Sequence, residues 1–139
     1  MSPTKSKETF SAEEKAAMRA RAKELKLAEE GEQAIEAALK KMTPPDRALG
    51  KRVHELVTKT APDLTPKTWY GMPAYANKNG KVICYFKNAG KFKMRYSEFG
   101  FNDSAKLDDG SMWPIVYALT KLTKADEVRI VQLVKQAVS

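Results

Sequence analysis

Apolar residues recur at helical spacing in three stretches of the chain, residues 32–42, 44–60 and 124–138. They fall at intervals of three and four, so that one side of each helix would be apolar and would face a core. In residues 32–42 these positions are Ile35, Ala38, Leu39 and Met42. The spacing predicts three packing helices.

Residues 11–30 have a different character. They are rich in Ala, Lys, Arg and Glu, and their only apolar stripe is Met18, Ala22 and Leu25. This pattern predicts a surface helix with high intrinsic propensity and a thin apolar face, and we expect Gly31 to break or bend it. Helix starts are predicted where a hydroxyl residue is followed three positions later by an acidic one, at Ser11, Thr43 and Thr123.

After residue 61 the apolar pattern predicts short strands, at residues 67–72, 74–76, 81–87, 91–96 and 114–122. The first two flank a Gly-Met-Pro corner, and the Asn-Gly pair in residues 77–80 is typical of a hairpin turn. Residues 91–96 alternate cations with Phe92, Met94 and Tyr96, which is the period of a half-buried antiparallel strand. Residues 102–111 are predicted to be a loop.

Helices and strands are segregated along the chain, which favours an α+β fold over a doubly wound one. We therefore predict an antiparallel sheet of four to five strands with helices packed on one face, plus an N-terminal helical extension. The predicted division is residues 1–31 for the extension and residues 32–139 for the α+β domain. A chain of 139 residues has room for one such domain and buries enough surface to need no covalent staple.

The composition bears on the cellular location of the protein. The single cysteine, Cys84, excludes an internal disulfide, and its apolar neighbours favour a buried core thiol over a nucleophile. The first ten residues are polar and no apolar stretch follows them, so no secretory signal or membrane span is expected. The expected location is the cytoplasm, without membrane association.

The net charge of +8 is unevenly distributed. Residues 5–41 hold nine basic and eight acidic side chains, whereas residues 67–106 hold eight basic side chains and only two acidic ones. A basic balance favours anionic partners. The excess lies in the middle of the chain, where the strands are predicted.

Several runs in this middle region resemble the YdhG-like family of small cytosolic α+β proteins. One run is Trp-Tyr-Gly-Met-Pro-Ala-Tyr at residues 69–75, of which Gly-Met-Pro-Ala-Tyr is the most specific part, and the likeness extends over residues 32–138. Most members of that family have no assigned function, and one branch is described as an intracellular iron chaperone. The resemblance implies the fold and, in that branch, iron held by carboxylates. This chain differs from that branch in being basic, with its acidic residues scattered along helices.

The candidate chemistry is sparse. With one histidine, His54, and one cysteine, the chain cannot build a His/Cys metal site. Asp108 and Asp109 are candidate ligands for a hard cation or iron, although Asp-Asp-Gly is also ordinary turn chemistry. No nucleophile has an evident base, and no Gly-rich phosphate loop is present, so we predict that the protein is not an enzyme and needs no cofactor.

Two surfaces remain as candidate binding sites. An aromatic corner for a small ligand is predicted from five residues, Trp69, Tyr70, Met72, Tyr75 and Trp113. The alternative is that these side chains are core. A basic strand face for an anionic partner, including single-stranded nucleic acid, is predicted from Lys91, Lys93 and Arg95. The alternative there is a solvated sheet face.

The sequence thus favours a non-enzymatic binding module for a small ligand or a metal ion, built on the aromatic corner and the adjoining loop of Asp108 and Asp109. The second hypothesis is anion or nucleic-acid binding through the basic strand face.

Overall fold

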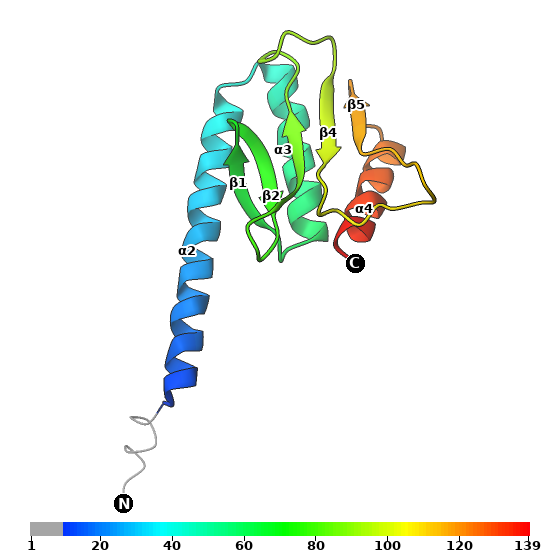
Figure 1. The fold of residues 1–139 in the computed structure, drawn as a ribbon. Helices are drawn as coiled ribbons and strands as arrows, with labels where there is room; N and C mark the ends of the chain where they lie inside the picture. The colour runs from blue at the N-terminus through cyan, green and yellow to red at the C-terminus, as the bar shows by residue number, and fades with distance from the viewer. Residues whose placement is uncertain (1–9) are drawn as a thin grey trace, which may run out of the picture.

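The computed structural model describes residues 10–139, and these form an α+β fold (Figure 1). Its helices are α2 (Ala12–Lys40), α3 (Pro44–Thr60) and α4 (Lys124–Val138). Its strands are β1 (Thr65–Trp69), β2 (Met72–Ala76), β3 (Val82–Lys87), β4 (Ser97–Phe101) and β5 (Val116–Leu119). The predicted fold class is confirmed.

The five strands form one antiparallel sheet in the order of the chain, β1-β2-β3-β4-β5. Each strand therefore reverses direction at a connection, and the connections alternate between the two ends of the sheet. The register shifts once, at a bulge between Tyr75 and Ala76 of β2 opposite β3. This alternation decides which loops meet, because segments distant in sequence come together at the same end (Figure 1).

One face of the sheet is buried against the helices. The largest buried side chains come from both sides of this interface and are each at most 1% exposed: Ile35, Val53, Val57, Tyr75, Cys84, Phe86, Phe99, Phe101 and Val134. Strand residues alternate between faces, so Trp69 and Tyr85 point to the other side. No helix of residues 10–139 covers that second face (Figure 1).

Two of the three predicted helix caps form. The Ser11 hydroxyl accepts from the backbone N–H of Glu14, and the Thr123 hydroxyl accepts from that of Asp126, each within a reciprocal capping box. Thr43 occupies the N-cap of α3, but its side chain makes no capping hydrogen bond. The predicted helix start at Thr43 is confirmed, but no capping box forms there, and the carboxylate of Asp46 accepts from the backbone N–H of Gly90.

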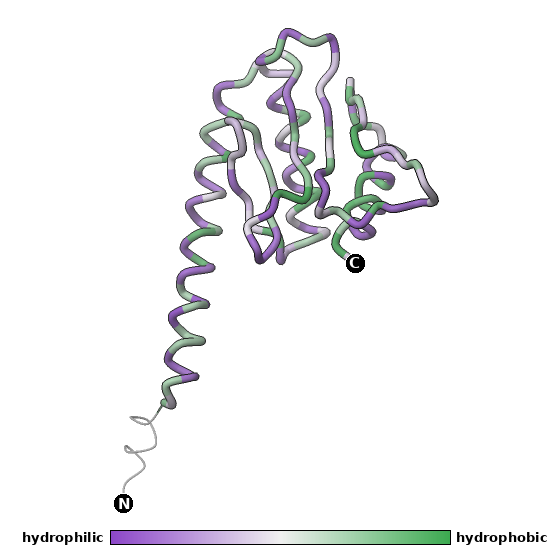
Figure 2. The backbone as a smooth tube through the Cα atoms, in the orientation of Figure 1, coloured by the Kyte–Doolittle hydropathy of each residue, from purple (hydrophilic) through white to green (hydrophobic). Residues whose placement is uncertain are grey.

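α2 is continuous through Gly31, and the predicted break there was wrong. Gly31 is buried where α2 crosses β1, and a Cβ atom at this position would lie 1.7 Å from the carbonyl oxygen of Pro66. The glycine permits a close backbone approach and does not end the helix. The helix thus crosses the predicted boundary at residue 31, and its exposed first half extends beyond the sheet with hydrophilic and hydrophobic residues alternating along it (Figure 2).

The predicted strand at residues 91–96 was also wrong. Residues 88–96 form an irregular connection between β3 and β4, and Lys93 has a φ of 54°, which no strand residue adopts. The predicted hairpin turn at residues 77–80 and the loop at 102–111 agree with the structure. Within residues 10–139, no helix is long and apolar enough to cross a membrane.

Replacing Glu127 of α4 with Gln is expected to make the free energy of unfolding depend less on pH in the acid range. Arg52 of α3 donates two hydrogen bonds of 2.8 Å to Glu127 and holds the pKa of that carboxyl below its ordinary value. Because the folded-state pKa is the lower one, this pair stabilises the fold above the ordinary pKa of Glu and loses its effect as pH falls through the folded-state pKa. Urea denaturation between about pH 6 and pH 3 should show wild type and variant converging. Glu30→Gln, at an exposed α2 position, is the control, and a constant gap between Glu127→Gln and wild type would contradict the prediction.

Candidate anion-binding site

The two ends of the sheet carry different charges. At one end lie the connections 41–43, 70–71, 88–96 and 120–123, which together hold five cations and no Asp or Glu: Lys41, Lys91, Lys93, Arg95 and Lys121. At the other end lie connections 61–64, 77–81 and 102–115, with four aspartates and three lysines. We call the first the basic end. Its positive potential attracts anions.

The basic loop, residues 88–96, is the largest part of the basic end and is held by buried anchors. The Asp46 carboxylate accepts from the backbone N–H of Gly90 at 2.8 Å, and the hydroxyl of Ser97 accepts from that of Ala89 at 3.0 Å. Asp46 is 8% exposed and Ser97 is 1% exposed. An exposed loop anchored to the core in this way is preorganised, so ordering it on ligand binding costs little conformational entropy.

Cations and aromatic rings alternate along the basic loop. The ammonium groups of Lys87 and Lys91 lie 4.7 Å and 5.5 Å from the centre of the Phe92 ring. The Arg95 guanidinium lies 5.0 Å from the Tyr96 ring. Such cation–π contacts keep the positive groups in a fixed place at the surface. The structure therefore brings Lys91, Lys93 and Arg95 into one loop, although not onto a strand face.

The β1–β2 turn packs beside this loop. Tyr70 and Gly71 have φ angles of 51° and 75°, which are typical of a type I′ turn, and the Tyr70 side chain is 80% exposed. The Lys91 ammonium donates to the Tyr70 carbonyl at 3.0 Å, and a Cβ at Gly71 would lie 2.3 Å from that ammonium. Glycine at position 71 thus makes room for Lys91. Tyrosine at position 70 is a strained choice where Asn or Gly is usual.

Aromatic side chains continue from this turn onto the open face of the sheet. The Trp69 ring lies 5.0 Å from that of Tyr70 and 5.3 Å from that of Tyr85, between ring centres. Tyr85 lies over Gly100 of β4, where a Cβ would come within 2.3 Å of the Tyr85 hydroxyl. The basic end thus adjoins a row of three partly exposed aromatic rings.

The predicted aromatic corner does not form as one site. Trp69 and Tyr70 lie at the β1 edge of the sheet, whereas Trp113 precedes β5 at the opposite edge and packs partly buried against the core. Tyr75 is fully buried on the helix-covered face and Met72 is 6% exposed. Of the five predicted ligand-binding residues, only Trp69 and Tyr70 share a surface.

Asp108 and Asp109 are exposed in the connection between β4 and β5, at the end of the sheet opposite the basic loop. No group of three or more His, Cys, Asp or Glu side chains suited to a metal ion occurs within residues 10–139. The two aspartates therefore stand without a third such ligand among the described residues.

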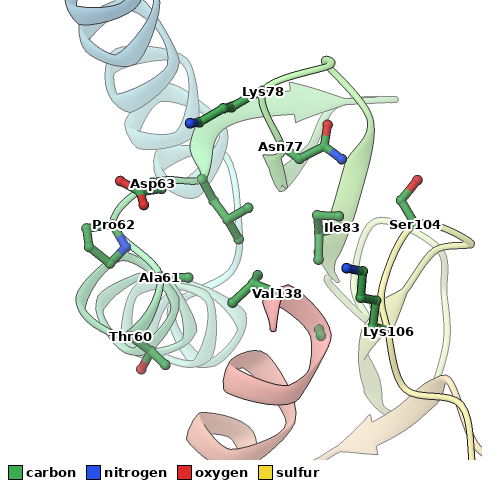
Figure 3. Close-up of a pocket in the computed structure, with 12 residues that line it drawn as sticks. Thr60, Ala61, Pro62, Asp63, Asn77, Lys78, Ile83, Ser104, Lys106 and Val138 are labelled. Atoms are coloured by element: carbon green, nitrogen blue, oxygen red, sulfur yellow. The ribbon is translucent and has the colours of Figure 1, made fainter.

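A pocket of about 370 Å³ opens between the C-terminal ends of α3 and α4 and the β2–β3 turn. The Lys106 side chain extends into it between Ile83 and Val138 (Figure 3). Carbonyl groups at helix C-termini carry partial negative charge, which Lys106 offsets. The pocket lining holds two lysines and one aspartate, fewer cations than the basic end, so it is the poorer anion site.

His54 lies beside the apolar stripe of α3, where a structural or exposed histidine is predicted, and it connects three elements. Its Nδ1 and the Tyr75 hydroxyl of β2 are hydrogen-bonded at 2.8 Å, and its Nε2 lies 3.1 Å from a carboxylate oxygen of Glu32 on α2. Burial raises the pKa of Tyr75 well above its ordinary value, so the phenol stays protonated. The arrangement has no room for a substrate at Tyr75, which is 0% exposed, and we interpret it as structural.

No family model, curated protein or solved structure matches this chain. The resemblance to the YdhG-like family therefore stays a prediction from residues 69–75 and their neighbours.

Proposed function

We propose that this protein binds single-stranded nucleic acid at the basic end. The observation that carries the proposal is the charge separation between the two ends of the sheet, with five cations and no acidic residue in the connections of one end. Phosphate backbones bind such surfaces through counterion release.

The aromatic rings among these cations favour a single strand over a duplex. Unpaired bases stack on exposed rings, and stacking needs no particular base sequence. Phe92 is 38% exposed between two lysines, and Tyr70 projects from the neighbouring turn at 80% exposed. Trp69 and Tyr85 extend the row along the open sheet face. Cations would hold the phosphates while these rings hold the bases.

The test is the affinity for a fluorescent oligothymidylate, measured by anisotropy over a range of salt concentrations. The triple variant Lys91→Ala, Lys93→Ala, Arg95→Ala should weaken binding about tenfold to a hundredfold at low salt. Each phosphate contact contributes about 0.7 to the slope of log affinity against log salt for a single strand. The slope should therefore fall by about 2 in the triple variant.

The control removes the same charge from the opposite end of the domain, in Lys59→Ala, Lys78→Ala, Lys135→Ala. These residues belong to the end of α3, the β2–β3 turn and the end of α4. Equal losses in the two triple variants would mean that net charge alone binds the strand. A wild-type affinity that does not change with salt concentration would overturn the proposal. So would binding to anionic vesicles without binding to the oligonucleotide.

A further inference from the structure

A groove of about 670 Å³ lies at the basic end, between the last turns of α2 and the basic loop. Ala34, Ala37 and Ala38 of α2 contribute an apolar side, and Lys41, Thr43, Asn88 and Lys91 contribute polar groups. We call it the α2–loop groove. Its volume is within the range of about 300–1,000 Å³ that is usual for small-molecule sites.

Asn88 is the least expected residue in this groove. It is 5% exposed, yet among residues 10–139 its side-chain amide has no hydrogen-bond partner, whereas its neighbours Ala89, Gly90 and Lys91 all have one. No fully enclosed side-chain polar atom of the described residues is left unpaired, so the polar atoms of this amide are reached from the groove. The Asn88 amide is therefore open to solvent or to a ligand in the groove.

The other groups around the groove favour an anion. Lys41 and Lys91 bring positive charge from the α2–α3 connection and from the basic loop. Thr43, which precedes α3, also lines the groove, and its hydroxyl makes no capping hydrogen bond.

Asp46 is the one acidic residue lining the groove. Its carboxylate is 8% exposed and accepts from the backbone N–H of Gly90 at 2.8 Å, so it is turned toward the loop that it anchors. Two ammonium groups, a hydroxyl and an amide remain as donors. A phosphate monoester offers three terminal oxygens to these donors, whereas an internal phosphodiester offers two.

We propose that the α2–loop groove binds a phosphate monoester, and that in the complex with a single strand this group is the terminal phosphate. The second part rests on the proposed function, because the groove shares Lys91 with the basic loop. The apolar side formed by the α2 alanines would then contact the sugar or base of the terminal nucleotide.

The test compares oligothymidylates that have a 5′-phosphate, a 3′-phosphate or hydroxyl groups at both ends, together with free thymidine monophosphate. A terminal phosphate at one end should tighten binding to the wild-type protein about tenfold. Lys41→Gln and Asn88→Asp should abolish this advantage, the second by placing a negative charge in the groove. Lys40→Gln is the matched control, because Lys40 is exposed, pairs with Glu36 and does not line the groove. Thermal melting of each variant establishes that it is folded.

The outcomes separate the two proposals. Equal affinity for phosphorylated and hydroxyl-ended strands would overturn the groove proposal and leave strand binding intact. Binding of the free monophosphate without any strand, lost in Lys41→Gln, would support the groove and overturn the proposed function. A protein that binds none of the four probes would overturn both.

Discussion

Replacing Gly31 with alanine is expected to destabilise the protein, although alanine is the better helix former. The Cβ atom of the variant would lie 1.7 Å from the Pro66 carbonyl oxygen, which belongs to the backbone of β1 and has no rotamer with which to move away. Overpacking of this kind costs typically about 1–3 kcal/mol, and the extreme contact puts Gly31 at or beyond the upper end. The propensity gain of about 1 kcal/mol offsets only part of it. We expect a net loss of about 2 kcal/mol in the free energy of unfolding, measured by urea denaturation.

The control is Gln33→Ala, at an exposed position of the same helix two residues away, where the change should stay within about 0.5 kcal/mol. A Gly31→Ala variant more stable than wild type would mean that α2 does not pack against β1 at this point. A Gly31→Leu variant extends the series, since its larger side chain should separate the helix from the sheet edge and lower the stability further.

The second large effect concerns the reactivity of Cys84. The thiol is 0% exposed in β3, and burial raises its pKa well above the ordinary range, so the reactive thiolate is suppressed as well as shielded. We expect a thiol reagent such as Ellman's reagent to label the native protein at least about 1,000-fold more slowly than the protein unfolded in guanidinium, because labelling requires opening of the core. The release of the coloured thiolate at mildly alkaline pH measures both rates.

The comparison with Glu127→Gln gives this experiment a control. A variant that lowers global stability should raise the labelling rate by the factor by which it raises the unfolded fraction. Rapid labelling of the native wild type would contradict the prediction and would place a local opening between β2 and β3, the strands paired at Tyr75 and Cys84.

The sequence predicted the packing helices well because their boundaries are encoded locally. α3 and α4 begin and end at the predicted residues, where Pro44 and the Thr123 capping box set their starts. Gly31 was misinterpreted because glycine can end a helix or permit a close tertiary contact, and the local sequence is the same in both cases. Only the position of Pro66, 35 residues later in the chain, distinguishes the two cases.

The candidate site was predicted only in part, for a related reason. Lys91, Lys93 and Arg95 alternate with apolar residues as in a strand, but the same alternation arises in the basic loop, where rings and cations stack on one another. Sequence spacing also could not place Lys41 and Asn88 in one groove, because that contact depends on which end of the sheet each connection occupies. The aromatic corner failed because alternate positions of adjoining strands put Trp69 and Tyr75 on opposite faces.

Among residues 10–139, Tyr70 and Lys93 are the two non-glycine residues with left-handed backbone angles, and this has a consequence for engineering the protein. Both lie at the basic end, and each holds a backbone conformation that asparagine or glycine adopts at lower cost. A library screened only for heat resistance would exchange these two positions early. The selected variants would be more stable. They would lack the Tyr70 ring and the Lys93 charge, both of which contribute to strand binding under our proposal.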